Sequence, residues 1–399
     1  MRRSAGSIAL ASALYFCALA GTSYAQEPSG GWQYGGFIDV PFLNSLNDPA
    51  NHLFRNRGTT PRVDEFDLDM TAAWLKKTAT EQSRVGLELT AQAGEDSQTF
   101  GFSSTAPNIS GADFLRHLGP TDVSYLAPVG KGLTIQGGIF SSLIGYDSLY
   151  SKDNLNYTRP WGADYTPYLM LGVNAAYPVT EKTTATVAVV NGYWHLAHAN
   201  DVPSFVGQFA YKANDRVTVK ETVLYGSHQP ATALEFWRAF SDTIIERKTD
   251  RLTIAFEYQL AGETVDAAGK PRALWMASQL PIRWVVRGPW SVTVRPEFAW
   301  DRDGRWISGQ LGDGQSIRAI TSMLEYRLKH QGAQAIFRIE HRYDNSTGPG
   351  GGFFDGGQNL LTPNQNLLAV GVILTFDGAV RAPGSDRAAV PLRTSRAPR

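Results

Sequence analysis

The sequence contains a single cysteine, Cys17, within an apolar segment near the amino terminus. One cysteine cannot form an internal disulfide, and the chain after Cys17 offers no thiol for catalysis or for a cysteine-based zinc site. Long apolar runs are also lacking, because no stretch of about 18 apolar residues follows the first 25 residues. This excludes a helical membrane protein. It does not exclude a membrane β-barrel, whose strands carry apolar residues only at alternate positions.

Charge is scarce and balanced. The chain has 37 basic and 37 acidic residues, and charged residues make up 19% of the sequence. A neutral balance argues against a nucleic-acid partner, which would require a basic excess. The sequence is instead rich in residues that suit strands facing lipid on one side, with 10 tryptophans, 16 tyrosines and 39 glycines.

The amino terminus has the organisation of a secretory signal. Arg2 and Arg3 precede an apolar run over residues 8–20, and Ser23-Tyr24-Ala25 fits a small-x-small cleavage site. The run is shorter than the ~20 apolar residues that a transmembrane helix needs. We therefore predict a signal peptide over residues 1–25 and secretion through the inner membrane.

Polar and apolar residues alternate with a period of two along most of the remaining chain. Residues 66–72, 85–93, 252–258, 292–298 and 337–343 all follow this pattern. Alternate residues of a strand point to opposite faces, so one face is apolar and the other carries carboxylates and guanidiniums. A soluble sandwich and a membrane barrel share this local pattern. The number, length and spacing of the strands must decide between them.

Strand number and spacing favour the barrel. Most candidates have 9–12 residues, close to the ~9–11 that cross a bilayer at a tilt, and short and long connections alternate between them. We predict an all-β, transmembrane, antiparallel up-and-down barrel of about sixteen strands over residues 26–376, with a disordered tail over residues 377–399. The predicted strands are 31–42, 64–75, 84–94, 121–128, 132–142, 166–178, 184–192, 205–212, 216–225, 239–247, 251–260, 273–283, 290–300, 316–327, 333–343 and 366–376.

Aromatic residues at predicted strand ends suit the two girdles by which a barrel meets lipid headgroups, although they are also simply good strand formers. The candidates are Trp32, Trp74, Tyr125, Tyr177, Tyr211, Tyr225, Tyr258, Trp290, Trp300, Tyr326 and Tyr343.

The sequence resembles a known family, the putative β-barrel porin-2 (OmpL-like) group, over residues 31–376. The resemblance is sharpest in segments 123–128 (VSYLAP), 132–140 (GLTIQGGIF), 151–159 (SKDNLNYTR), 176–182 (AYPVTEK), 189–192 (VVNG), 324–327 (LEYR) and 338–344 (RIEHRYD). It implies a porin in the bacterial outer membrane and no particular solute. The tail departs from a chain that ends on an aromatic strand.

A barrel of sixteen strands is wide enough for an aqueous channel with a polar lining. The polar alternates are therefore our candidates for the lumen, and Arg295/Glu297 and Arg338/Glu340/Arg342 could form facing charged rows across a pore. The alternative is that they are neighbouring salt bridges that stabilise the wall. The full set is Asp67, Asp69, Glu88, Gln92, Asp122, Gln136, Lys220, Glu257, Arg295, Glu297, Glu325, Arg327, Arg338, Glu340, Arg342 and Asp344.

The third long connection, residues 143–165, is our candidate for a loop that folds inward and narrows the barrel. It carries Lys152, Asp153 and Arg159 together with aromatic residues that include Tyr157 and Trp161. The alternative is a loop packed over the rim.

Glu221 breaks the pattern, because it shares a face with valines that should meet lipid. Either a bulge shifts the register there, or the barrel pairs with another subunit, for which we expect a homotrimer. The charge balance of the barrel gives a second expectation. The amino-terminal segment and the tail hold seven of the arginines and two of the aspartates, which leaves 30 basic and 35 acidic residues and indicates a mild cation preference.

The sequence thus predicts an outer-membrane porin that lets small hydrophilic solutes or ions diffuse through a water-filled barrel, with no enzyme activity, cofactor, metal or nucleic-acid partner. A plugged barrel that acts as an adhesin is a second hypothesis, and an outer-membrane hydrolase using Ser227, His228 or His341 is a third. No Gly-x-Ser-x-Gly motif supports the hydrolase. His195, His198 and Asp201 resemble a metal cluster, but a solvated loop explains them more simply.

Overall fold

The computed structural model describes residues 31–100, 112–197, 202–227, 233–265, 272–307 and 313–379. The predicted signal peptide and residues 380–399 lie outside the described residues. No helix among the described residues is long and apolar enough to cross a bilayer.

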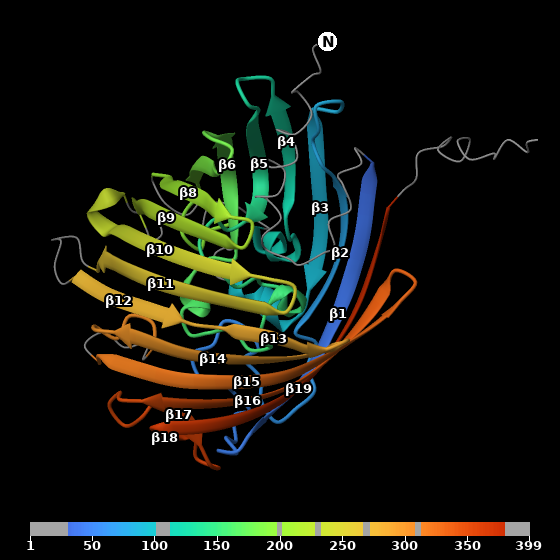
Figure 1. Cartoon of the computed structure of the whole chain (residues 1–399). Coiled ribbons are helices and arrows are strands. Elements are labelled where there is room, and N and C mark those ends of the chain that lie inside the picture. Colours follow the sequence, from blue (N-terminus) through green and yellow to red (C-terminus); the bar gives the residue numbers. More distant parts are fainter. Residues whose placement is uncertain are drawn as a thin grey trace, which may run out of the picture.

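The chain forms one closed antiparallel barrel, in which each strand pairs with its sequence neighbours and β1 closes the ring by pairing with both β2 and β19 (Figure 1). Seventeen strands occupy sixteen positions, because β12 and β13 share one. The predicted class and strand number are confirmed. The strands are β1 (Trp32–Ser45), β2 (Met70–Lys77), β3 (Val85–Ala93), β4 (Thr121–Ala127), β5 (Leu133–Ser141), β6 (Leu169–Pro178), β7 (Thr183–Val190), β8 (Ser204–Asn214), β9 (Val217–Ser227), β10 (Trp237–Lys248), β11 (Leu252–Thr264), β12 (Arg272–Gln279), β13 (Ile282–Arg287), β14 (Trp290–Asp301), β15 (Gln315–His330), β16 (Ala333–Ser346) and β19 (Asn364–Ala379).

Alternation along the strands separates the two faces of the barrel. On β19, Leu368, Val370 and Leu374 point outward and are exposed, whereas Ala369 and Ile373 between them point inward and are buried. The period of two in the sequence therefore becomes an apolar exterior and an interior that carries most of the charge.

Short turns join the strands at one end of the barrel and long loops join them at the other. The turn between β15 and β16 places Gln331 (φ 42°) and Gly332 (φ 83°) in the left-handed region, as a two-residue type I′ hairpin requires. Where the structure describes them, the long loops contain five short 3₁₀ helices and a small hairpin. The helices are η2 (Glu95–Phe100), η3 (Ala112–His117), η4 (Ser151–Asp153), η5 (Ala163–Tyr165) and η6 (Leu234–Phe236), and the hairpin is formed by β17 (Phe353–Asp355) and β18 (Leu360–Thr362).

The predicted strand over residues 64–75 is wrong in its first half. Phe66 makes only an isolated bridge to Phe42, and β2 begins at Met70. Asp69 and Met70 are both buried, so the alternation inverts at this point and Met70, rather than Thr71, faces the interior. The Phe-Asp-Leu-Asp alternation that suggested a strand belongs to the end of the preceding loop.

Proline interrupts the strand predicted over residues 273–283. Pro281 has no N–H to donate, and the position splits into β12 and β13. The ladder is held across the break by Leu280 N donating to Pro296 O (3.0 Å) and by Ala255 N donating to Pro281 O (3.1 Å). At the carboxyl end, β19 continues to Ala379, three residues into the segment predicted as tail.

The aromatic residues predicted for the girdles lie mostly on the outer face. Trp290 and Tyr326 pack at 4.7 Å between ring centroids near the short turns, and Tyr225 stacks on Trp237 near the long loops. Trp74 is an exception. It shares the inward face with Met70, and the ammonium of Lys152 lies 5.3 Å from its ring centroid.

Candidate functional site

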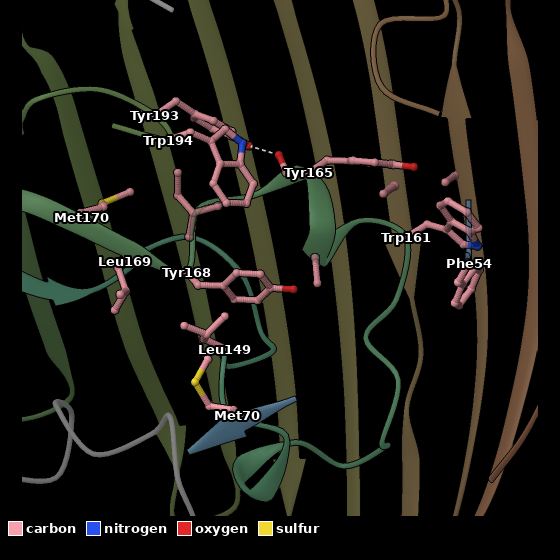
Figure 2. Packing of buried hydrophobic residues seen from close by; sticks show 14 of the residues in the cluster. Phe54, Met70, Leu149, Trp161, Tyr165, Tyr168, Leu169, Met170, Tyr193 and Trp194 are labelled. Carbon is pink, nitrogen blue, oxygen red and sulfur yellow. Dashed lines mark hydrogen bonds between the residues drawn. The ribbon is translucent and has the colours of Figure 1, made fainter. Parts of the chain in front are cut away.

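The chain between β5 and β6, residues 142–168, folds into the barrel and crosses to the opposite wall. We call it the inner loop. Gly145 N donates to Asp242 on β10 (2.8 Å) and Trp161 N donates to Glu297 on β14 (2.6 Å). Figure 2 shows the loop's Leu149, Trp161, Tyr165 and Tyr168 side chains inside the ring of strands. The prediction that this loop folds inward agrees with its position.

The charges on the inward face of β16 bind the backbone of the inner loop. Arg338 donates to the carbonyl oxygens of Ser151 (2.6 Å) and Asn154 (2.9 Å). Glu340 accepts from Tyr157 N (2.7 Å) and Thr158 N (2.9 Å). Because guanidiniums only donate and ionised carboxylates only accept, the alternating charges match the alternating C=O and N–H groups of the loop.

The inward face of β14, on the other side of β15, carries a second set of alternating charges that bind the loop. Arg295 donates to Thr158 O (2.7 Å), and Glu297, which receives Trp161 N, also pairs with Arg342 of β16 (2.9 Å). Arg342 in turn donates to Arg159 O (3.0 Å). The inward faces of β14 and β16, which belong to the same wall, therefore hold the same stretch of loop.

The facing charged rows predicted across a pore are therefore wrong as an open lining. Arg295, Arg338, Glu340 and Arg342 are each 1% exposed, because the inner loop covers them. The alternative, in which these charges stabilise the structure, describes them better. They bind the inner loop more than they bind one another across the wall. Glu257, Glu297 and Asp344 are buried beneath the same loop.

The second half of the inner loop, residues 156–168, is buried throughout. Trp161 packs against Phe54 of the first long loop and Phe353 of the last, and the guanidinium of Arg57 lies 4.9 Å from its ring centroid. Tyr193 OH donates to Tyr165 O (2.6 Å; Figure 2). Tyr157, Arg159 and Trp161, which we expected to line a constriction, instead anchor the loop.

The first half of the inner loop, residues 142–155, is largely half-buried. Lys152 and Asp153 pair at 2.8 Å, and each side chain is 15% exposed. The Lys152 ammonium lies over the rings of Phe37, Trp74 and Tyr150, at 5.3–5.9 Å from their centroids. Of the five predicted constriction residues, these two keep partial exposure, whereas Tyr157, Arg159 and Trp161 are buried.

The wall that the loop leaves uncovered carries the other half-exposed charges. Lys76 on β2 pairs with Glu88 on β3 (2.7 Å), and Lys220 points inward from β9. Asp122 on β4 also points inward but is only 6% exposed. Near the short turns, Glu325 on β15 forms ion pairs with Arg327, with Arg338 and with Arg283 of β13 (3.0 Å for the last).

Two predicted lumen residues fall outside the strands. Asp67 precedes β2 and is half-buried, with its carboxylate accepting from Leu68 N (2.7 Å). Asp69 is buried, and its Oδ2 lies 3.0 Å from the hydroxyl of Tyr157.

A second buried charge network ties the inner loop to the first two long loops. Arg159 pairs with Asp96 of η2 (2.7 Å), which also accepts from Thr60 N (2.6 Å), and Arg57 pairs with Asp164 (2.8 Å). Burial raises the pKa of Asp96 to about 7, and the Arg159 guanidinium keeps it from rising further.

Sequence reasoning missed several interior charges. Asp39 lies between Ile38 and Val40, so the alternation of apolar and polar residues in this segment could have identified Asp39 as an inward-facing charge. Arg238 pairs with Glu263, and its guanidinium lies 4.5 Å from the ring centroid of Tyr193. Neither contact could be read from the sequence, because Glu263 stands among polar residues and Tyr193 is distant from Arg238 along the chain.

Glu221 points outward from β9 with no shift in register at its position. It pairs with Phe209 of β8 and Thr243 of β10, and the bulge between β8 and β9 lies at residues 212–214. Its carboxylate accepts from Ser241 Oγ (2.7 Å) and Thr243 Oγ1 (2.5 Å). The bulge alternative for Glu221 is therefore wrong.

The hydrolase residues do not come together. His341 lies on the outer face of β16, 3.3 Å from Asn366 Oδ1, whereas Ser227 ends β9. His228, His198 and Asp201 lie outside the described residues. The structure groups no three metal-ligating side chains within the part of the chain that it describes.

A closed sixteen-position barrel, apolar outside and charged inside, with a loop folded into its interior, defines the class of outer-membrane channels. The family described as "Putative beta-barrel porin-2, OmpL-like" matches residues 31–376. The chain belongs to this family and is a porin of the bacterial outer membrane.

Solved structures share the fold at low identity. The anion-selective porin from Comamonas acidovorans is similar with a TM-score of 0.57 and 11% identity, covering 86% of this chain and 99% of that one. The outer membrane channel DcaP of Acinetobacter baumannii has a TM-score of 0.53 and 10% identity, covering 89% and 99%. OmpT of Vibrio cholerae, folded in vitro, has a TM-score of 0.50 and 10% identity, covering 89% and 100%. No curated protein matches the chain.

Proposed function

We propose that small hydrophilic solutes and ions pass between the first half of the inner loop and the wall formed by β2–β9. The observation that carries this proposal is the difference between the two halves of the loop: residues 142–155 stay largely half-buried, while residues 156–168 are buried against the opposite wall. Side chains that line a wet passage must retain contact with water.

Lys76, Glu88, Lys152, Asp153 and Lys220 are the charges that we assign to this passage. Two of the lysines are already paired with carboxylates, at 2.7 and 2.8 Å, and therefore attract passing anions weakly. Together with the acidic excess of the barrel, this supports a mild preference for cations. Lys220 makes no ion pair within the described residues, so it offsets that preference.

The proposed passage predicts how selectivity responds to charge. We would measure the reversal potential across a planar bilayer in a salt gradient, for the natural chain and for the Lys220→Glu variant. We expect a weak cation preference that strengthens severalfold in the variant. Arg318→Glu is the matched control, because it makes the same change of charge at an exposed position on the outer face of β15 and should change selectivity little. Equal shifts in both variants would contradict the passage.

We also propose that the barrel self-associates through the outer face of β9 and β10 around Glu221. A carboxylate on a face otherwise formed by valines and aromatic residues is costly in lipid, even with two hydroxyl donors. Replacing Glu221→Val should leave the barrel folded and change its assembly, measured by mass in detergent. A natural chain that is monomeric, or a variant with unchanged assembly, would refute this.

A further inference from the structure

We propose that Asp39, Tyr157 and Asp69 form a proton-dependent latch, which holds the inner loop against β1 while Asp69 carries a proton and opens when that proton is lost. Asp39 lies on β1, Tyr157 lies in the inner loop, and Asp69 lies just before β2. The latch therefore joins three segments that are distant in the sequence.

The number of hydrogens at this site requires a proton on one carboxyl group. The Tyr157 hydroxyl lies 2.9 Å from Asp39 Oδ1 and 3.0 Å from Asp69 Oδ2, yet it has only one hydrogen to donate. Asp39 also accepts from Ser151 Oγ, so it is the carboxylate with two donors. Asp69 must then donate its own hydrogen to the tyrosine oxygen.

The remaining oxygen of Asp69 supports this assignment. Asp69 Oδ1 is buried and has no hydrogen-bond partner among the described residues. A buried ionised carboxylate with a single shared donor would be costly, whereas a protonated carboxyl leaves only a neutral carbonyl oxygen unpaired.

Neighbouring charges do not neutralise the pair. Arg159 is the base of the inner loop that acts on both carboxyl groups, and it pairs with Asp96 of η2 at 2.7 Å. Arg338 of β16 pairs with a glutamate of β15 at 2.8 Å. Asp96 lies close enough to Asp69 for the two carboxylates to repel each other when both are ionised. Neither Asp39 nor Asp69 has an ion pair of its own within the described residues.

Loss of the proton to water would leave two anions sharing one hydroxyl hydrogen. Asp39, Tyr157 and Asp69 are at most 1% exposed, so water cannot screen their repulsion in place. The repulsion is relieved when Tyr157 and the loop around it move away from β1. Raising the pH should therefore free the middle of the inner loop, and lowering the pH should fix it.

The test is the mobility of a spin label in the inner loop. The label is attached through Leu155→Cys, a half-buried position, in the full chain carrying Cys17→Ser so that one site reacts. Spectra of the folded barrel are recorded from about pH 5 to about pH 10. We expect the immobilised component to be lost as the pH rises. In the Asp69→Asn variant, whose amide donates to Tyr157 at every pH, that component should persist.

One control separates the latch from other carboxyl groups. Asp153→Asn removes a half-exposed acid of the same loop and leaves the ion pair between Arg159 and Asp96 in place. This variant should keep the pH response. A natural chain whose label is equally immobile at every pH would overturn the proposal, and so would an Asp69→Asn variant that still responds. The effect of the latch on passage rests on the proposed function, but label mobility does not, so the two proposals can fail separately.

Discussion

Removing the Glu340 carboxylate should detach the inner loop from the wall. Glu340 accepts four hydrogen bonds from three consecutive loop residues: Asn156 Nδ2 (3.2 Å), Tyr157 N (2.7 Å), Thr158 N (2.9 Å) and Thr158 Oγ1 (2.5 Å). Hydrogen bonds to a charged group contribute about 1.5–3 kcal/mol each, and they are not additive.

The magnitude follows from leaving buried donors without an acceptor. Each buried donor left unsatisfied costs about 1–3 kcal/mol, so two or three of them together cost about 4 kcal/mol. At about 1.4 kcal/mol per tenfold change, a loss of about 4 kcal/mol shifts the balance between docked and undocked loop roughly a thousandfold. Glu340→Ala should therefore undock the inner loop and leave the barrel folded, because it removes no hydrogen bond between strands.

Hydrogen exchange of the inner-loop amides reports this balance directly, since Tyr157 N and Thr158 N are the groups that Glu340 protects. In Glu340→Ala, loop peptides should exchange up to about a thousandfold faster while strand peptides stay protected. Glu88→Ala is the matched control, because its half-exposed ion pair contributes at most about 1 kcal/mol. Unchanged loop exchange in a folded Glu340→Ala barrel would refute the clamp.

Two further perturbations test neighbouring parts of the account. A Cβ on Gly371 of β19 would lie 2.7 Å from the Tyr157 ring, so Gly371→Val should displace the ring and lower the thermal unfolding temperature, whereas Gly357→Val, where a Cβ meets nothing within 4 Å, should not. Burial raises the pKa of Asp96 to about 7, so the folded chain holds a proton there that the unfolded chain loses near pH 4. Its contribution is fully present below about pH 4 and is lost as the pH rises through about 7. Asp96→Asn should flatten that decline in unfolding temperature, and parallel curves would contradict it.

The fold was predictable because strands that face lipid on one side and the interior on the other require apolar and polar residues to alternate with a period of two. Strands such as β3 and β16 alternate so regularly that their bounds differ from the prediction by only a few residues. Prediction failed where another contact overrode the period. Met70 turns inward to join the interior packing, and Pro281 divides a strand whose composition is otherwise continuous.

The site was harder to predict because the role of its charged residues depends on which distant segment packs over them. The inward charges of β14 and β16 were identified correctly as a set. Nothing local in the sequence, however, indicates that residues 156–168 would lie over them and bury them. The same covering explains why Tyr157 and Trp161, whose aromatic character suited a constriction, serve as anchors.

The decisive experiment is a single-channel conductance measurement on the refolded barrel in a planar bilayer. An open barrel should give discrete, stable open steps, with a reversal potential that indicates a weak cation preference in a salt gradient. A barrel that folds correctly, shifts its gel mobility on heating and yet conducts nothing would contradict the channel and favour a plugged barrel.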